Sequence, residues 1–412
     1  MTTPIVITGL GVVSPFGDAA DTFRDALLGG RTAIAPDPSF AERGCRSVLS
    51  ARIAGFEPAK WIPPMKLRRM DGTGPLALVI ARQAAAQAGY PFSDAGDDRA
   101  GVVLGTYSAG GQATTDYLTA LFAGGPTGAP ALLFNSTVGN AAAGLTGLEL
   151  KLRGANATLA HKEASGLAAI VTAVDLLRHE RLDAVLAGGI DSIYDLFFRV
   201  HDRFGVLNPA RQPDESVAPF AASRNGFVLG EGGFGVWLER ADAARARGAA
   251  QLAEVAGTAA SSAAVPLNAW PDRAEPLVRT MRLALADAGM DARDVDVVYA
   301  SANASPGLDL VEAQALSEVF GGSATAVTAI KGAIGESGAA SAAGCVAAVL
   351  CGLAGAVPPI AGLRTAEPAT ASLRLTRATV AGPARVALVN GFASGGALFS
   401  VVLRVQDQQR PT

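Results

Sequence analysis

Two stretches of sequence decide the fold, ATLAHKEASGLAAI at residues 157–170 and AVTAIKGAIGESGAASAAG at residues 326–344. Each begins with a short apolar run typical of a buried strand, passes a turn containing Gly or Ser, and continues into an Ala-rich pattern typical of a buried helix. The repeated order predicts an internally duplicated α/β fold. We place the seam near residues 245–260, which gives an N-terminal half at residues 1–250 and a C-terminal half at residues 251–412.

The composition excludes several classes of protein. The chain has 412 residues, of which 50% are hydrophobic and 17% charged, and its formal net charge is −3. A chain so apolar and so weakly charged is expected to bury a large core and not to be disordered. It has no excess of basic residues with which to neutralise a phosphate backbone, so we expect no nucleic-acid partner.

The N-terminus and the cysteines indicate a protein of the reducing cytoplasm. The opening MTTPIVITGLGVV lacks the basic region and cleavage site of a signal peptide and is typical of a first strand. The longest apolar segment, residues 339–357, is interrupted by Ser and Gly, so we expect a buried helix and no membrane span. Three cysteines form neither an even disulfide framework nor a metal-binding spacing, and we expect no metal and no cofactor.

Two glycine motifs resemble nucleotide-binding loops but lack the required context. In TGLGVVSPFG the third glycine of the fingerprint is replaced by Ser14. The second motif, GEGGFG at residues 230–235, lies between two segments with strand character, whereas the fingerprint needs a helix to hold the pyrophosphate. The chain also has only three histidines and no G-x-S-x-G motif, which argues against metal and serine-hydrolase chemistry.

Eight motifs in a fixed order cover nearly the whole chain. They are IVITGLGVVSPFG (5–17), KLRRMDGTGPLAL (66–78), GVVLGT (101–106), LDAVLAGGIDS (182–192), PFAASRNGFVLGEGGFGVWLER (219–240), DLVEAQALSEVFG (309–321), TAIKGAIGESGAASAAG (328–344) and NGFASGGALFSVVL (390–403). In sequence and spacing they resemble the ketosynthases of the thiolase superfamily, the condensing enzymes of fatty-acid and polyketide synthesis. The resemblance implies a thiolase-like five-layered αβαβα fold made of two duplicated halves and assembled as a dimer.

The catalytic positions depart from the family pattern. Ketosynthases carry a cysteine in a T-A-C-[ST]-S-G-L stretch, where a helix N-terminus stabilises the thiolate. Alignment on residues 165–167 places Glu163 in this nucleophile slot. The two family histidines, which would stabilise charge on the reacting thioester and carbanion, correspond to Ser301 and Glu336, whereas the family lysine is retained as Lys331.

The remaining family features indicate that the fold is kept while the catalytic residues are lost. The gate G-F-G-G reads A-S-G-G at residues 393–396, yet the structural glycines are present. This combination resembles the chain-length factor, or ketosynthase β subunit, of type II polyketide synthases, which pairs with a catalytic α subunit. Chain-length factors usually carry Gln in the nucleophile slot, so Glu163 departs from that branch. The other motifs lie nearer the fatty-acid-synthase pattern, which favours a reduced or polyene-type pathway.

The resemblance implies a subunit without independent activity inside a beta-ketoacyl-[acyl carrier protein] synthase complex. Its expected partners are the ketosynthase α subunit, in a heterodimer, and an acyl carrier protein bearing the growing chain, with no membrane involved. Two alternatives stay open. One is a malonyl-carrier-protein decarboxylase that supplies the starter unit, although decarboxylating relatives keep both histidines. The other is a structural or regulatory paralogue.

By the same resemblance, the subunits pair through the strand near residues 155–159 and flanking segments around residues 105–145. The chain would thereby shape an apolar tunnel at the subunit interface that sets polyketide chain length. The residues expected to line this tunnel are Tyr107, Gln112, Thr114, Asp116, Tyr117, Leu132, Leu133, Phe134 and Thr137.

Overall fold

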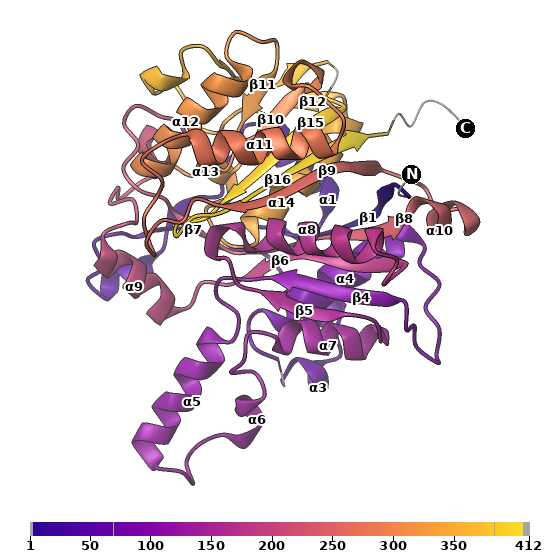
Figure 1. Ribbon diagram of the computed structural model, residues 1–412. Coiled ribbons are helices and arrows are strands. Elements are labelled where there is room, and N and C mark those ends of the chain that lie inside the picture. Colours follow the sequence, from indigo (N-terminus) through magenta and orange to yellow (C-terminus); the bar gives the residue numbers. More distant parts are fainter. Residues whose placement is uncertain (1–2, 69, 383, 407–412) are drawn as a thin grey trace.

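A large mixed β-sheet forms the centre of the molecule (Figure 1). The computed structural model describes residues 3–68, 70–382 and 384–406. Within these residues the sheet has eleven strands in the order β13-β11-β10-β15-β16-β9-β1-β8-β6-β4-β5. Their bounds are β1 (Ile5–Val13), β4 (Ala100–Gly105), β5 (Asn156–Leu159), β6 (Ala184–Asp191), β8 (Gly232–Arg240), β9 (Ala253–Ser262), β10 (Val297–Tyr299), β11 (Ala326–Thr328), β13 (Arg374–Leu375), β15 (Val386–Phe392) and β16 (Ala397–Val405).

The strand order confirms the duplication predicted from the two opening stretches. With the short edge strand β13 left out and the strands numbered within their own half, β5-β4-β6-β8-β1 reads 3-2-4-5-1, and β11-β10-β15-β16-β9 reads the same. The pairing directions also match, because only the fourth and fifth strands and the fifth and first strands of each half run antiparallel. The halves join where β1 and β9 pair antiparallel. The division at residues 250 and 251 stays a prediction.

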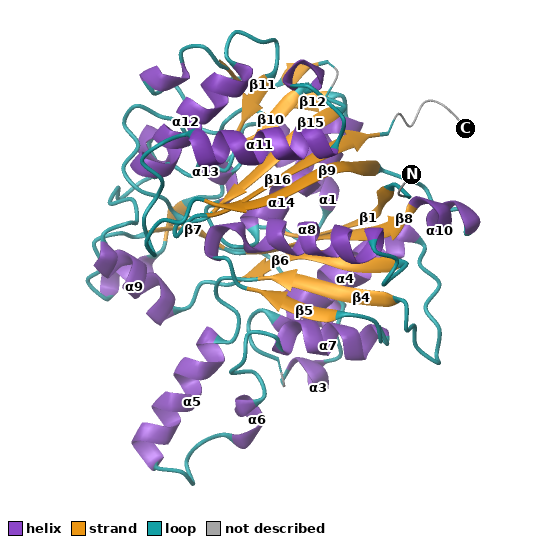
Figure 2. Ribbon diagram, in the orientation of Figure 1, coloured by secondary structure: helices purple, strands orange, loops and turns teal. Residues whose placement is uncertain are grey.

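Helices lie between and outside the two halves of the sheet, giving the five layers of the thiolase-like fold (Figure 2). Two central helices, α8 and α14, contact each other and strands of both halves. Outer helices α4 and α7 cover the N-terminal half, and α11 and α12 lie on the C-terminal half. The helix bounds are α1 (Ala20–Leu28), α2 (Pro38–Glu42), α3 (Pro64–Leu67), α4 (Gly74–Ala88), α5 (Gly111–Gly124), α6 (Ala131–Phe134), α7 (Ala141–Leu150), α8 (Ser165–Arg178), α9 (Asp195–Phe204), α10 (Ala241–Ala246), α11 (Glu275–Asp287), α12 (Pro306–Phe320), α13 (Lys331–Ile334) and α14 (Ala340–Leu353).

Small residues allow the two central helices to approach closely. A Cβ added to Gly166 on α8 would lie 2.8 Å from the Ala342 Cβ and 2.9 Å from the Gly338 carbonyl oxygen. Helix α14 is buried from Ala340 to Cys351, as its apolar sequence predicted. No helix in the described part of the chain has the length and apolar character needed to cross a bilayer.

The two glycine motifs set aside as nucleotide loops lie in strands. The first motif begins inside β1 and continues into the turn after it, and the second runs from the end of β7 (Leu229–Gly230) into the start of β8. The shorter strands form two small sheets with the bounds β2 (Ala35–Pro36), β3 (Leu49–Ala51), β12 (Ala356–Val357) and β14 (Val380–Ala381).

One end of the large sheet is open. Strand β5 is the terminal strand and pairs with β4 on one side. Near this end, α5 and α6 extend away from the body of the molecule as a helical hairpin, drawn at the lower left of Figure 1. We call residues 111–137 the α5–α6 hairpin.

Candidate functional site: a substituted ketosynthase centre

The nucleophile slot lies in a tight turn between β5 and α8. The turn is a short 3-10 helix, Lys162–Ala164, and Lys162 adopts a left-handed φ of 49°. Two hydrogen bonds fix the turn: the His161 amide donates to Ser165 Oγ at 2.9 Å, and the Gly166 amide donates to the Gly338 oxygen at 2.8 Å. Residue 163 is thereby held at the first turn of a buried central helix.

Glu163 fills this slot with a buried carboxyl group. Its side chain is only 3% exposed, and it accepts hydrogen bonds from Ser394 Oγ at 3.0 Å and from the Ser394 amide at 3.2 Å. Ser394 Oγ also accepts from Lys162 Nζ at 3.2 Å. Burial raises the pKa of the Glu163 carboxyl, which the Ser394 bonds and the nearby Lys162 only partly oppose.

The second histidine slot holds a buried ion pair. Glu336 Oε2 lies 2.8 Å from Lys331 Nζ and accepts from Asn303 Nδ2 at 2.6 Å, while Oε1 accepts from the Ser337 amide at 2.9 Å. Burial raises the pKa of Glu336 to about 7; Lys331 opposes this shift and the nearby Glu163 adds to it. The two carboxyl groups therefore interact electrostatically across the site.

Ser301, at the first histidine slot, forms hydrogen bonds that hold the backbone. Its Oγ accepts from the Phe392 amide at 2.9 Å, and its own amide donates to Glu312 Oε1 at 2.9 Å. Asn303, two residues later, is the side chain of this segment that reaches Glu336. Sequence reasoning missed Asn303, because the motif spacing pointed to position 301 alone.

Two buried acids on α12 hold this segment in place. Asp309 accepts from the amides of Phe220, Asn303 and Ala304 at 2.7, 2.9 and 3.1 Å, respectively. Glu312 accepts from Ser301 and from Asn390 Nδ2, the latter at 3.1 Å. Burial raises the pKa of Asp309 to about 6 and that of Glu312 to about 7. Both carboxyl groups therefore act as supports behind the site.

A cavity of about 680 Å³ opens above Glu163. Glu163 and Ser394 lie in its lining, which also includes several aromatic side chains and, as polar groups, two asparagines and Ser305. The lining residues are Tyr107, Glu163, Phe197, Val200, His201, Phe204, Gly205, Val206, Asn225, Gly226, Phe227, Asn268, Trp270, Ser305, Pro306, Gly307 and Ser394. The cavity thus lies over the position predicted as the nucleophile slot, where a carboxyl group stands.

Of the residues predicted to line a tunnel, only Tyr107 borders this cavity. The others lie on the α5–α6 hairpin and contact one another: Gln112 donates to Asp116, Thr114 Oγ1 donates to the Thr137 oxygen, and the Tyr117 and Phe134 rings lie 5.6 Å apart. Leu132 and Phe134 are 75% and 59% exposed. Leu133 is partly exposed. The tunnel role of the hairpin stays a prediction about the assembled complex.

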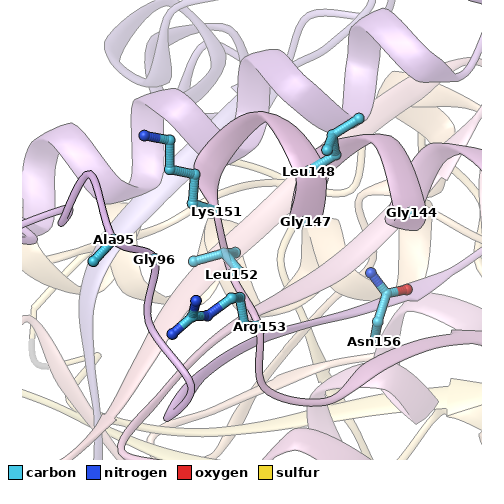
Figure 3. Close-up of a pocket in the computed structure, with 9 residues that line it drawn as sticks. All are labelled: Ala95, Gly96, Gly144, Gly147, Leu148, Lys151, Leu152, Arg153 and Asn156. Carbon is cyan, nitrogen blue, oxygen red and sulfur yellow. The ribbon is translucent and has the colours of Figure 1, made fainter.

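A separate hollow of about 380 Å³ lies beside β5 and α7 (Figure 3). Its cations are already paired, Lys151 with Asp94 at 2.9 Å and Arg153 with Asp98 at 2.8 Å. Asn156 donates to the Ala143 oxygen. None of the predicted site residues lines this hollow, so it is not a candidate centre. Within the described residues, no group of three His, Cys, Asp or Glu side chains is arranged to hold a metal ion.

Comparison with known proteins gives the family of the chain. Residues 2–244 match the model of the beta-ketoacyl synthase N-terminal domain, and residues 252–364 match that of the C-terminal domain. The chain is 33% identical to the tetracenomycin polyketide synthase ketoacyl synthase beta subunit of Streptomyces glaucescens, over 89% of each chain. It is 32% identical to nodulation protein E of Rhizobium sp. (strain N33), over 95% of this chain and 96% of the relative.

Among solved structures, the ishigamide ketosynthase/chain length factor matches with a TM-score of 0.91 and 28% identity, covering 98% of this chain and all of the other. The fold and the family models agree over nearly the whole length. The chain therefore belongs to the beta-ketoacyl synthase family of the thiolase superfamily.

Proposed function

We propose that this protein is a non-catalytic ketosynthase-like subunit, a chain-length factor, that pairs with a catalytic ketosynthase and shapes the tunnel for the growing chain. The observation that carries the proposal is the substituted centre. Glu163 occupies the nucleophile slot under hydrogen bonds from Ser394, and Glu336 occupies a histidine slot in an ion pair with Lys331. The surrounding fold is intact.

The substituted centre is unsuited to acyl transfer. A cysteine thiolate exchanges acyl groups between thioesters, whereas attack by a carboxylate would form a mixed anhydride in place of a thioester. Burial favours the neutral, weakly nucleophilic form of Glu163, and Ser394 donates hydrogen bonds to both of its carboxyl oxygens. The histidine that borders the cavity, His201, is held by Tyr107 and Phe197.

The same centre argues against malonyl decarboxylation. Loss of carbon dioxide leaves an enolate that needs hydrogen-bond donors placed at the developing charge. Here the two histidine slots hold Ser301, whose hydroxyl bonds to backbone, and Glu336, whose carboxyl group is an acceptor when ionised. A malonyl carboxylate would also approach Glu163 and Glu336. We expect no carbon dioxide release when the purified chain is mixed with malonyl-carrier protein; release above the uncatalysed rate would favour the decarboxylase alternative.

Two surface features support the proposal that the chain associates with a partner subunit. Strand β5 leaves one edge of the large sheet open, and such edges are generally covered or paired. Close by, the α5–α6 hairpin exposes large apolar side chains, of which Phe122 is 82% and Leu132 75% exposed. Clustered exposed apolar residues mark association surfaces. A relative named as a ketoacyl synthase beta subunit and a neighbour named as a ketosynthase/chain length factor support a catalytic ketosynthase as the partner.

Co-expression tests the assembly. Together with a catalytic ketosynthase from the same organism, the chain should elute as a one-to-one complex that extends carrier-bound chains, and neither subunit alone should do so. Expressed alone, the chain should aggregate or associate poorly, because obligate interfaces are large and apolar. A stable monomer with no affinity for that ketosynthase would contradict the proposal and favour the structural or regulatory paralogue.

A further inference from the structure

We propose that an aromatic wall closes the cavity above Glu163 on the side of the α5–α6 hairpin, so that this subunit's own pocket admits only short acyl groups. We define the aromatic wall as Tyr107, Tyr194, Phe197 and His201. The inference rests on the proposed function, since it explains why a long chain would grow only from the partner's site.

The wall is held by directed hydrogen bonds. His201 Nδ1 lies 2.8 Å from the Phe197 carbonyl oxygen, which can only accept, so Nδ1 carries the proton. In the neutral ring Nε2 is then an acceptor, and Tyr107 Oη donates to it at 3.1 Å. Burial lowers the pKa of His201, which favours this neutral form. Tyr107 is therefore fixed at its hydroxyl end.

The backbone of Tyr107 is fixed as well. Asp191, buried at the end of β6, accepts from the Tyr107 amide at 2.8 Å, the Ser108 amide at 2.7 Å and Thr106 Oγ1 at 3.0 Å. The same carboxylate accepts from the Ala339 amide just before α14. This clamp ties the turn after β4 to the central helix layer, so the Tyr107 ring has a rigid base.

The rings of the aromatic wall pack against one another. The Phe197 ring centroid lies 5.0 Å from Tyr107 in an edge-to-face arrangement, 4.4 Å from His201, and 5.5 Å from Tyr194. Such edge and stacked contacts are favourable geometries for aromatic side chains. The four side chains therefore form a continuous surface between β4 and α9.

The wall stands between the cavity and the hairpin. Tyr107, Phe197 and His201 border the cavity, and no described residue of α5 or α6 does. On the other side, the Tyr194 hydroxyl touches the start of α5, since a Cβ on Gly111 would lie 1.9 Å from its oxygen. A chain leaving residue 163 toward the hairpin must displace Tyr107.

Thiol labelling of the purified complex tests the wall. Glu163→Cys places a thiol at the cavity floor; it displaces iodide from an iodoacetamide, forming a C–S bond and releasing its proton to buffer. We expect iodoacetamide to label Glu163→Cys and N-dodecyl iodoacetamide to label it poorly. We compare the two reagents by the labelling rate of N-dodecyl iodoacetamide divided by that of iodoacetamide. In the double variant Glu163→Cys/Tyr107→Ala this ratio should rise about tenfold, because the steric barrier is gone. Intact mass spectrometry identifies which subunit is labelled. The wild-type chain, whose three cysteines are buried, is the unlabelled control.

Two matched variants separate the wall from general loosening. Tyr107→Phe keeps the ring and should leave the ratio low, and Tyr117→Ala removes an equal ring from the hairpin and should also leave it low. Equal labelling by both reagents with the wall intact, or no rise in the ratio with Tyr107→Ala, would overturn the proposal.

A crystal structure of Tyr107→Leu tests the wall independently of thiol reactivity. The cavity should become continuous with the hairpin surface, and a cavity that is still closed there would contradict the proposal. Labelling requires no turnover, so failure here is distinct from failure of the chain-length role.

Discussion

Glu163 experiences two opposing influences at one position. The N-terminus of α8 favours negative charge, whereas full burial favours the neutral acid, and the structure resolves the conflict with two hydrogen bonds from Ser394. The carboxyl group thus fills and closes the slot that a reactive thiol would occupy. In this account its shape and hydrogen bonding matter, and its ability to ionise does not.

This account predicts different results for two substitutions. In the complex, Glu163→Gln should keep condensation within about twofold of wild type, because Gln preserves the volume and an acceptor for Ser394. Glu163→Ala should lower stability by about 1–3 kcal/mol, because it leaves a cavity and an unpaired donor. Turnover and thermal unfolding measure the two effects. A large loss of turnover in an intact Glu163→Gln complex would give the carboxylate an active role.

Glu312 makes stability depend on pH in a definite direction. Its pKa is raised from the usual 4.5 of a glutamate to about 7, mainly by burial, so the folded state keeps a proton that the unfolded chain releases. Its stabilising effect is therefore complete below about pH 4.5 and is lost as the pH rises through about 7. Asp309 and Glu336 act in the same direction.

Glu312→Gln should flatten this dependence. Between roughly pH 5 and pH 8 the decrease in unfolding free energy should shrink by about 1–3 kcal/mol, measured by urea unfolding at several pH values. The exposed Glu318→Gln, on the same helix, is the control and should leave the dependence unchanged. An equal pH dependence in wild type and Glu312→Gln would show that this carboxyl group is not the source.

At the scale of elements, the α5–α6 hairpin is the part of the chain whose function requires another molecule. Its apolar side chains are exposed, and the wall of Tyr107 separates them from the pocket above Glu163. A cavity lined by this hairpin would therefore form between subunits. A larger side chain there shortens the space available, and a smaller one admits further carbons, each worth about 0.8 kcal/mol when buried.

Product length should follow these changes. Thr114→Phe should shorten the products of the reconstituted complex, and Phe134→Ala or Tyr117→Ala should lengthen them, as measured by mass spectrometry. Leu283→Ala, on the outer helix α11, removes another exposed apolar side chain and should leave the products unchanged. Identical chain lengths across the hairpin variants would contradict the tunnel role.

The elements themselves were largely predictable from local pattern. Apolar runs and Ala-rich segments predicted β5, α8, β11 and α14, because these elements are buried throughout or paired in the sheet. The family motifs predicted the substituted slots, and this assignment stays a prediction. The contacts of Asn303 with Glu336 and of His201 with Tyr107 were not predictable, because they join residues 33 and 94 positions apart. Such pairs are created by the fold and leave no local pattern.

At the scale of the whole molecule, duplication explains why two acids meet at one site. Glu163 precedes α8 and Glu336 precedes α14, the corresponding central helices of the two halves. The junction of β1 with β9 brings the halves together, so both helix starts meet below one cavity. In a catalytic relative the same junction would assemble a thiol and an imidazole; here it assembles two carboxyl groups, Lys331 and Ser394.

The central claim is that acyl chemistry in the complex occurs on the partner's cysteine and never on this chain. Intact mass spectrometry of both subunits, after incubation of the complex with an acyl-carrier protein, tests it most directly. The account predicts one acyl mass increment on the ketosynthase partner and none on this chain. An acyl increment on this chain, abolished by Glu163→Gln, would contradict it.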